Sequence, residues 1–98
     1  MSDEYRVYHS IEVGREFRRI LSVCQRRGDL DLALASARWI LSELKSTPLE
    51  QGEARYAKED ESGRMLFRIT SAGPIQVEYA VRDDVKMVFI RRFALRKS

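Results

Sequence analysis

Apolar and polar residues change their spacing twice along this chain. Residues 5–9 alternate between the two classes, as in a short strand with one buried side. Residues 11–46 carry apolar side chains three and four positions apart, which is the spacing of amphipathic helices. Residues 65–69 and 75–81 alternate again, and residues 87–90 are apolar throughout. The pattern therefore predicts one strand, then two helices, and then several strands.

The first helix is predicted to run from about Ile11 to Arg27. Ser10 suits the N-cap, because its hydroxyl can accept a hydrogen bond from a free backbone N–H of the first turn. Gly28 suits the left-handed residue that ends a helix. The buried stripe of this helix is expected to comprise Val13, Phe17, Ile20, Leu21 and Cys24.

The second helix is predicted to follow at once and to stop before Pro48, whose ring cannot continue a helix. Asp29 or Asp31 is expected to cap its start with a side-chain hydrogen bond. Trp39 is interpreted as a core or rim anchor rather than as a platform for stacking a ligand. The apolar face is expected to comprise Ala33, Ala37, Ile40, Leu41 and Leu44, widened by Leu30, Leu34 and Trp39 so that two sides are buried.

A hairpin is predicted shortly after Pro48. Three consecutive acids, Glu59–Glu61, precede Ser62-Gly63, and like charges side by side favour solvent over burial. The Ser-Gly pair is typical of a turn. We expect a solvent-exposed hairpin tip here, with residues 54–58 as one possible arm.

Three further strands are expected after this tip. Alternation marks residues 65–69 and, most clearly, residues 75–81. Turn sequences at 71–74 and 82–84 separate the strands. Residues 87–90 are apolar throughout, which is typical of a strand covered on both faces.

The order of these elements predicts a single α+β domain over residues 1–98, with the order β-α-α-β-β-β. We expect an antiparallel sheet with a helical hairpin packed on one face, because the apolar side of the strands needs a cover. The other face would be free to meet a partner.

Composition is that of a soluble globular protein, with 44% hydrophobic and 34% charged residues among 98. No apolar run approaches the roughly 20 residues that a membrane-spanning helix needs. Residues 1–4 are acidic and lack the apolar stretch of a signal peptide. We therefore expect a cytoplasmic protein without membrane contacts.

Few residues offer chemistry of their own. Cys24 is the only cysteine and His9 the only histidine, so an intrachain disulfide and a thiolate metal site within one chain are excluded. Catalytic triads and metal sites that depend on histidine have little support. Cys24 is interpreted as a small buried side chain. We predict no metal and no cofactor, and we assign no catalytic residue.

Positive charge is concentrated toward the C-terminus. Residues 1–63 hold 10 basic and 12 acidic side chains, whereas residues 64–98 hold 8 basic and 3 acidic ones. Such a region can attract a phosphate backbone or an acidic protein segment. The alternative is a set of solvated strand edges and a charged tail. No acid follows Asp84, and the basic residues beyond it are Lys86, Arg91, Arg92, Arg96 and Lys97.

The joint order of these features resembles the RelE/ParE toxin superfamily, a group of small basic bacterial proteins from toxin–antitoxin pairs. The resemblance covers nearly the whole chain. It rests on Ser10 before the first helix, Gly28-Asp29, the Leu44, Pro48 and Gly52-Glu53 spacing, the 75–81 strand, the acidic turn after it and Val88-Phe89-Ile90.

The resemblance implies one of two activities. RelE-like members cleave messenger RNA on the ribosome, using basic and aromatic side chains on the open sheet face and near the C-terminus. ParE-like members poison DNA gyrase and lack that set. Here Gln76 stands where the nucleases often have an arginine, and Arg96 roughly matches the arginine after the last strand. The tyrosine that usually follows has no counterpart before Ser98.

The candidate binding residues combine this resemblance with the charge pattern. Arginine binds phosphate through its planar fork but is a poor proton donor or acceptor because its pKa exceeds ~12. Glu78 is either a general base or a solvated strand residue, and Tyr79 is expected in the core. The candidates for binding nucleic acid or a partner are Arg64, Arg68, Gln76, Glu78, Arg91, Arg92 and Arg96.

Three functions remain open at this point. The leading prediction is a ParE-like toxin component, of the plasmid-stabilisation type, that acts by binding macromolecules. Its expected partner is an antitoxin protein, with gyrase, the ribosome or RNA as the second partner and a homodimer also possible. The alternatives are a ribosome-dependent mRNA endoribonuclease and a degenerate, non-toxic interaction domain of the same fold.

Overall fold

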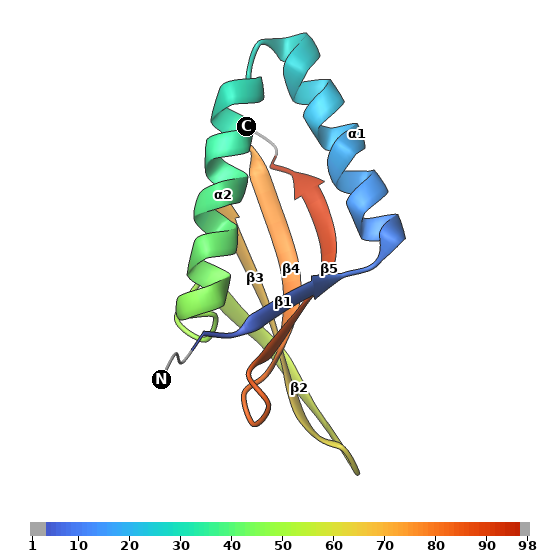
Figure 1. Cartoon of the computed structure of the whole chain (residues 1–98), viewed down its shortest axis with the longest axis vertical. Coiled ribbons are helices and arrows are strands. Elements are labelled where there is room, and N and C mark those ends of the chain that lie inside the picture. Colours follow the sequence, from blue (N-terminus) through green and yellow to red (C-terminus); the bar gives the residue numbers. More distant parts are fainter. Residues whose placement is uncertain (1–3, 97–98) are drawn as a thin grey trace.

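The computed structural model describes residues 4–96 and forms a two-layer α+β fold (Figure 1). Lys97, counted above in the basic region, and residues 1–3 of the acidic N-terminus lie outside the described residues. The elements, in chain order, are β1 (Arg6–His9), α1 (Ile11–Arg27), α2 (Leu30–Ser46), β2 (Glu53–Asp60), β3 (Gly63–Ala72), β4 (Ile75–Arg82) and β5 (Met87–Leu95).

The sheet has five strands in the order β1-β5-β4-β3-β2. The strands from β2 to β5 pair with their sequence neighbours in antiparallel fashion. β1 pairs with β5 in parallel, so the prediction of a wholly antiparallel sheet is wrong and the sheet is mixed. A parallel pair needs a long connection between its strands, and here nearly the whole chain supplies it.

A fourth strand precedes the three that were predicted after the helices. The possible hairpin arm at residues 54–58 lies within a full strand, β2, of eight residues. All eight are exposed, and β2 forms the edge of the sheet. A strand with no buried side leaves no alternating apolar signal, which explains why the predicted β-α-α-β-β-β order is one strand short.

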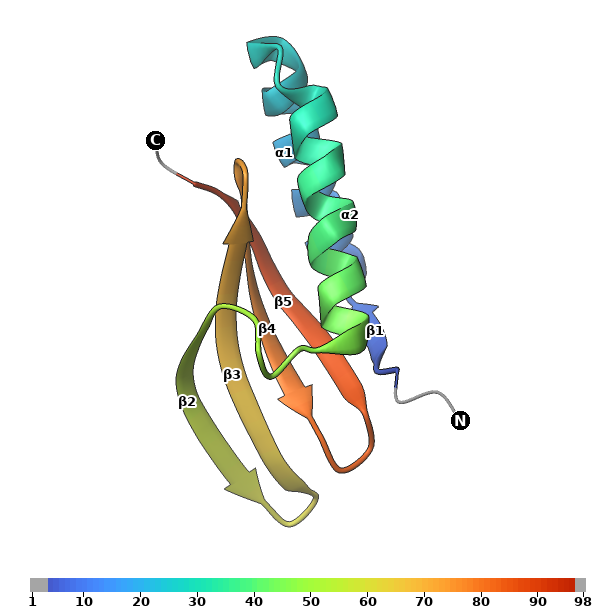
Figure 2. The same ribbon diagram turned by 90° about the vertical axis from the view of Figure 1, so that its left-hand side faces the viewer.

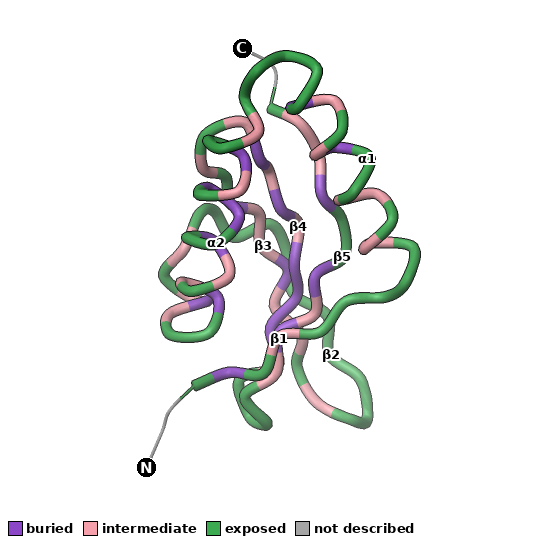
Figure 3. The backbone as a smooth tube through the Cα atoms, turned by 45° about the horizontal axis from the view of Figure 1, so that its top comes forward, coloured by how far each residue is buried: buried purple, intermediate pink, exposed green. Residues whose placement is uncertain are grey.

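Both helices lie on the same side of the sheet (Figure 2). α1 packs on β5, and α2 packs on β1, β3 and β4. Val77, Val81 and Val88 are fully buried beneath them, together with Ile40 and Leu44 of α2. Figure 3 shows this burial concentrated along β4, while β2 is exposed along its length. The expected helical cover is therefore confirmed, and the opposite side of the sheet is uncovered. We call that side the open face.

Helix boundaries match the sequence prediction closely, with one exception at a cap. The Ser10 hydroxyl accepts a hydrogen bond from the Val13 N–H at 3.2 Å, and Gly28 adopts φ 80°. Asp29 occupies the N-cap of α2, but its side chain makes no capping hydrogen bond. Only two residues, Gly28 and Asp29, separate the two helices. Asp29 has φ −107° and ψ 12°, outside the extended conformation typical of an N-cap.

The core contains Cys24 and Tyr79, as predicted, at 1% and 0% exposure. Trp39, in contrast, is 49% exposed on α2. α2 is therefore covered on one side only, and the predicted two-sided burial is wrong. Ala35, on the same helix, is exposed as well.

Candidate binding site on the open face of the sheet

One line of register partners crosses the open face from edge to edge. Tyr8 of β1 lies opposite Phe89 of β5, which lies opposite Ala80 of β4. Ala80 in turn faces Phe67 of β3, and Phe67 faces Tyr56 of β2. Residues directly opposite each other project from the same side of a sheet. We call these five residues the aromatic row.

The rings of the aromatic row form two stacked pairs. Tyr8 and Phe89 have ring centroids 5.7 Å apart with planes 25° from parallel, and Tyr56 and Phe67 have centroids 4.5 Å apart at 14°. Ala80 between them is only 1% exposed, so neighbouring side chains close over it. The outer ring of each pair remains open, because Tyr8 is 39% and Tyr56 50% exposed.

Two cations lie directly on this row. The Arg91 guanidinium carbon is 4.8 Å from the centroid of the Phe67 ring, and Arg91 Nη1 donates to the Tyr56 hydroxyl at 3.3 Å. Lys58 Nζ lies 5.8 Å from the Phe67 centroid and 5.9 Å from that of Tyr56. These are cation–π distances. Positive charge and aromatic surface are therefore combined in one place.

A β-bulge explains how Arg91 reaches the row. Glu78 pairs with Arg92, whereas Tyr79 pairs with Ile90, so Arg91 is the extra residue of β5. Such a bulge redirects a side chain relative to the regular alternation. A second bulge in β2, between Ala54 and Tyr56, has Arg55 as its extra residue. Both irregularities place an arginine beside the row.

A small hollow of about 80 Å³ lies next to the Tyr56–Phe67 pair. Arg55, Arg91 and Glu78 are among the residues that line it. A larger and shallower hollow of about 290 Å³ follows toward the end of the sheet, with Gln76 and Arg96 in its lining. The polar and charged side chains that line the two hollows therefore continue the open face beyond the aromatic row.

Six of the seven predicted site residues line the two hollows or pair with a residue that does. Gln76 and Arg96 line the larger hollow, Glu78 and Arg91 line the smaller one, and Arg92 pairs with Glu78 at 3.6 Å. The expectation that Glu78 is simply solvated is incomplete, since it has this cationic partner. Phosphate-binding groups and a carboxylate therefore occur side by side.

Arg68 also lines the smaller hollow, whereas Arg64 does not join the group. Arg68 lies opposite Tyr79, on the side of the sheet that faces the helices, and donates from Nε and Nη2 to the Gln51 carbonyl at 3.1 and 2.9 Å. It thus holds the loop between α2 and β2. Arg64 lies near the hairpin tip, where it pairs with Glu59 at 3.7 Å.

The rings of the aromatic row and Lys58 were missed as site residues in the sequence analysis. The sequence signal was partial, because Phe89 alternates with the core residues Val88 and Ile90 but Phe67 stands among the apolar positions of its own strand. Single exposed apolar side chains are common on protein surfaces, so only their grouping into one patch is informative. Recognising the row, however, requires the register of all five strands.

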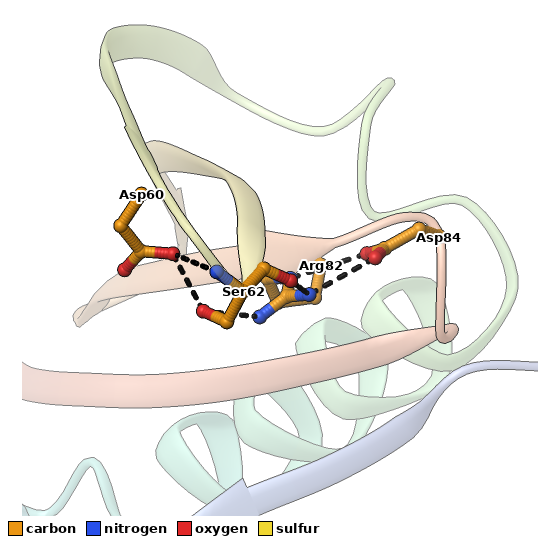
Figure 4. A network of polar contacts seen from close by, with 4 residues as sticks. All are labelled: Asp60, Ser62, Arg82 and Asp84. Atoms are coloured by element: carbon orange, nitrogen blue, oxygen red, sulfur yellow. Dashed lines mark hydrogen bonds and ion pairs between the residues drawn. The ribbon is translucent and has the colours of Figure 1, made fainter.

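The lower border of the open face is fixed by a polar network between two turns (Figure 4). Arg82 donates to Asp84 at 3.1 and 2.9 Å and also to the Ser62 carbonyl. The Ser62 backbone and hydroxyl donate to Asp60 Oδ1 at 2.8 and 2.5 Å. Hydrogen bonds from Ser62 hold the pKa of Asp60 below its usual range, and those from Arg82 do the same for Asp84. The β2–β3 tip is thereby tied to the β4–β5 turn.

Within residues 4–96, no group of three or more His, Cys, Asp or Glu side chains is placed to hold a metal ion. Neither α1 nor α2 combines the length and apolar character that crossing a bilayer requires.

Comparisons of the chain with family models, with curated proteins and with solved structures gave no match. Functional inference therefore rests on the geometry of the open face and on the sequence resemblance.

Proposed function

We propose that this protein is the toxin-like component of a bacterial toxin–antitoxin system and acts in the cytoplasm by binding macromolecules through its open face. The observation that carries the proposal is the aromatic row with Arg91 and Lys58 directly on it. An uncovered sheet face that exposes rings and cations together is suited to recognition rather than to packing. The RelE/ParE resemblance supplies the toxin–antitoxin context, and an antitoxin protein is the expected partner.

Growth of a bacterial host during induced expression tests this proposal. We expect arrest with the unmodified chain and relief with the double variant Arg91→Ala/Arg92→Ala. Arg26→Ala is the matched control, since Arg26 is an exposed arginine on α1, away from the open face. Co-expression of the protein encoded by the adjacent reading frame should restore growth and co-purify with the chain. Normal growth with the unmodified chain would favour the degenerate interaction domain instead.

A ribonuclease is the second candidate, because Glu78 lines the same small hollow as Arg55 and Arg91. Cleavage of RNA needs a base for the 2′-hydroxyl, an acid for the leaving 5′-oxygen and cations on the scissile phosphate. Glu78 could take the proton from the 2′-hydroxyl and return it to the leaving oxygen, with Arg55 and Arg91 on the phosphate. The test is the integrity of transcripts after induction. Intact messages during arrest support binding alone, whereas cleavage that Glu78→Gln abolishes would establish the nuclease.

A further inference from the structure

We propose that two copies of this chain pair through their β2 edge strands and form a symmetric dimer with one continuous sheet. The free backbone groups of β2 and the order of charges along that strand carry this inference. It does not depend on the proposed function, because it concerns the edge of the sheet and leaves the open face accessible.

β2 directs unpaired backbone groups away from the sheet. Asp60 and Gly63 are register partners across a two-residue turn, and such a closing pair exchanges backbone hydrogen bonds. Hydrogen-bonded pairs alternate along an antiparallel ladder, so Lys58 also points its N–H and C=O groups toward β3. Ala57 and Glu59 therefore point theirs outward, on the last strand of the sheet.

The outer edge of β2 is open to an approaching strand. All eight residues of β2 are exposed, and both helices lie away from it, over the other side of the sheet (Figure 2). The β-bulge involves Arg55, so residues 56–60 keep a regular register with β3. A long exposed edge of this kind is a template for pairing with another strand.

The order of charges along β2 selects the partner. Charged side chains on an edge strand oppose pairing with most other strands. Two β2 strands that meet antiparallel around Ala57 avoid this penalty, because Arg55 of each copy then lies opposite Glu59 of the other. In the same register Tyr56 lies opposite Lys58, within reach of a cation–π contact.

Neighbouring registers match less well. Outward-pointing groups of two copies can also meet in dimers centred on Lys58 or on Tyr56. The first would place two lysines face to face, and the second would place Glu53 opposite Glu59. Like charges directly opposite each other destabilise a strand pair. Ala57 is therefore the centre that suits both the backbone and the charges.

Pairing at this edge joins the two open faces. Tyr56 of each copy lies diagonal to Tyr56 of the other in the proposed register, at about 7–8 Å, a separation that aromatic side chains can bridge. The two aromatic rows thus continue into one another across the dimer axis. The Tyr56 ring, 50% exposed in the single chain, is then covered in part by the second copy.

Sedimentation equilibrium of the full-length chain over a wide range of concentrations tests the proposal. We expect the average mass to rise from the 11.4 kDa of one chain toward twice that value. Amide exchange at Ala57 and Glu59 should slow as the dimer forms, because their N–H groups are bonded only there. Exchange at Lys58, whose N–H already bonds to β3, should change much less.

Ala57→Pro separates pairing between copies from pairing within the chain. Proline is tolerated on an edge strand where its missing N–H would face solvent. We therefore expect the dimer to be lost while β2 stays paired with β3, and the melting temperature of a dilute sample shows whether the variant is folded.

Charge reversal tests the register. Arg55→Glu and Glu59→Arg should each weaken the dimer by about tenfold or more, since each places two pairs of like charges across the axis. An equimolar mixture of the two variants should restore the affinity, because opposite charges face each other in the mixed dimer. Glu12→Arg, the same change at an exposed position of α1, should leave the affinity unaltered.

Three results would overturn the inference. The first is the mass of a single chain at every concentration, and the second is a dimer that survives Ala57→Pro and both charge reversals, which would place the contact on another surface. The third is a chain that stays monomeric alone and gains protection at Ala57 and Glu59 only from the protein of the adjacent reading frame, which would assign the edge to that protein.

Discussion

At the scale of single residues, Tyr79 shows how one side chain can join the sheet to a loop. Its ring is fully buried, and its hydroxyl lies 2.7 Å from the Pro48 carbonyl oxygen and 3.1 Å from that of Gln51. Burial raises the pKa of Tyr79, so the neutral hydroxyl is the donor at ordinary pH. The loop that carries the chain from α2 to the sheet edge is held by this contact and by Arg68.

Tyr79→Phe tests this contact. We expect the free energy of unfolding to fall by about 1–3 kcal/mol, because a buried carbonyl loses its donor while the packing of the ring is retained. Urea denaturation measures the change. Tyr8→Phe is the control and should cost little, since Tyr8 is 39% exposed. Equal effects of the two substitutions would show that the buried hydroxyl has no special role.

At the scale of secondary-structure elements, two glycines set where the helices and the edge strand begin and end. Gly28 and Gly52 both have positive φ, at 80° and 59°. Their surroundings differ, however. A Cβ at Gly28 would meet nothing within 4 Å, whereas a Cβ at Gly52 would lie 1.9 Å from the Ile69 carbonyl oxygen. Gly52 is therefore needed for close packing of two backbone segments as well as for its conformation.

Alanine substitutions at these glycines should differ in cost. Gly28→Ala is expected to lower the free energy of unfolding by about 1–2 kcal/mol, the cost of a left-handed alanine. Gly52→Ala should cost more, because β2 must also move away from β3. Chemical denaturation of both variants measures this. Amide exchange in β2 should accelerate in Gly52→Ala alone, and a similar exchange pattern in both variants would contradict the steric argument.

The turn network is a second feature at this scale. Arg82 links the β4–β5 turn to the β2–β3 tip through Ser62. Arg82→Ala should increase amide exchange at the tip without unfolding the core, because the hairpin extends beyond the helices there (Figure 2). Arg64→Ala removes only an exposed ion pair with Glu59 and should have little effect. Unchanged exchange at the tip in Arg82→Ala would show that strand pairing alone fixes it.

At the scale of the whole molecule, contacts between the two ends of the sequence complete the sheet. β1 pairs with β5, and the Tyr5 hydroxyl donates to Asp83 in the turn before β5. Lys86 Nζ donates to the same carboxylate at 3.0 Å and lies 4.8 Å from the centroid of the Tyr5 ring. Hydrogen bonds from Tyr5 and then Lys86 hold the pKa of Asp83 below its usual range.

Low pH should weaken the contacts that Asp83 makes with Tyr5 and Lys86. A carboxyl group with a lowered pKa in the folded state stabilises the fold above its unfolded-state pKa of about 3.9, and the contribution is lost as pH falls through the folded-state pKa. The melting temperature of the unmodified chain should exceed that of Asp83→Asn at pH 7, and the gap should narrow below about pH 4. A gap independent of pH would assign the effect to packing instead of charge.

The helices and their ends, the buried face of β4 and the burial of Cys24 and Tyr79 could be predicted from the sequence alone, whereas the apolar face read from the alternation of β3 lies on the open face and β5 is covered on one face instead of two. The features that could be predicted follow from short-range spacing, because a helix or a half-buried strand repeats its apolar positions within a few residues. The basic character of the C-terminal third is equally a property of the sequence. The candidate arginines and Gln76 could be named from the sequence, but the sequence did not show which of them lie close together in space.

Only the tertiary structure decided that Arg91 lies on Phe67, that Arg68 supports a loop on the other side of the sheet, and that four rings from four strands form one row. The parallel pairing of β1 with β5 and the exposed edge strand β2 were likewise decided there. Each depends on the register between segments far apart in the chain, and a single-residue shift would move every side chain of a strand to the opposite face. No local pattern of apolar and polar residues contains that information.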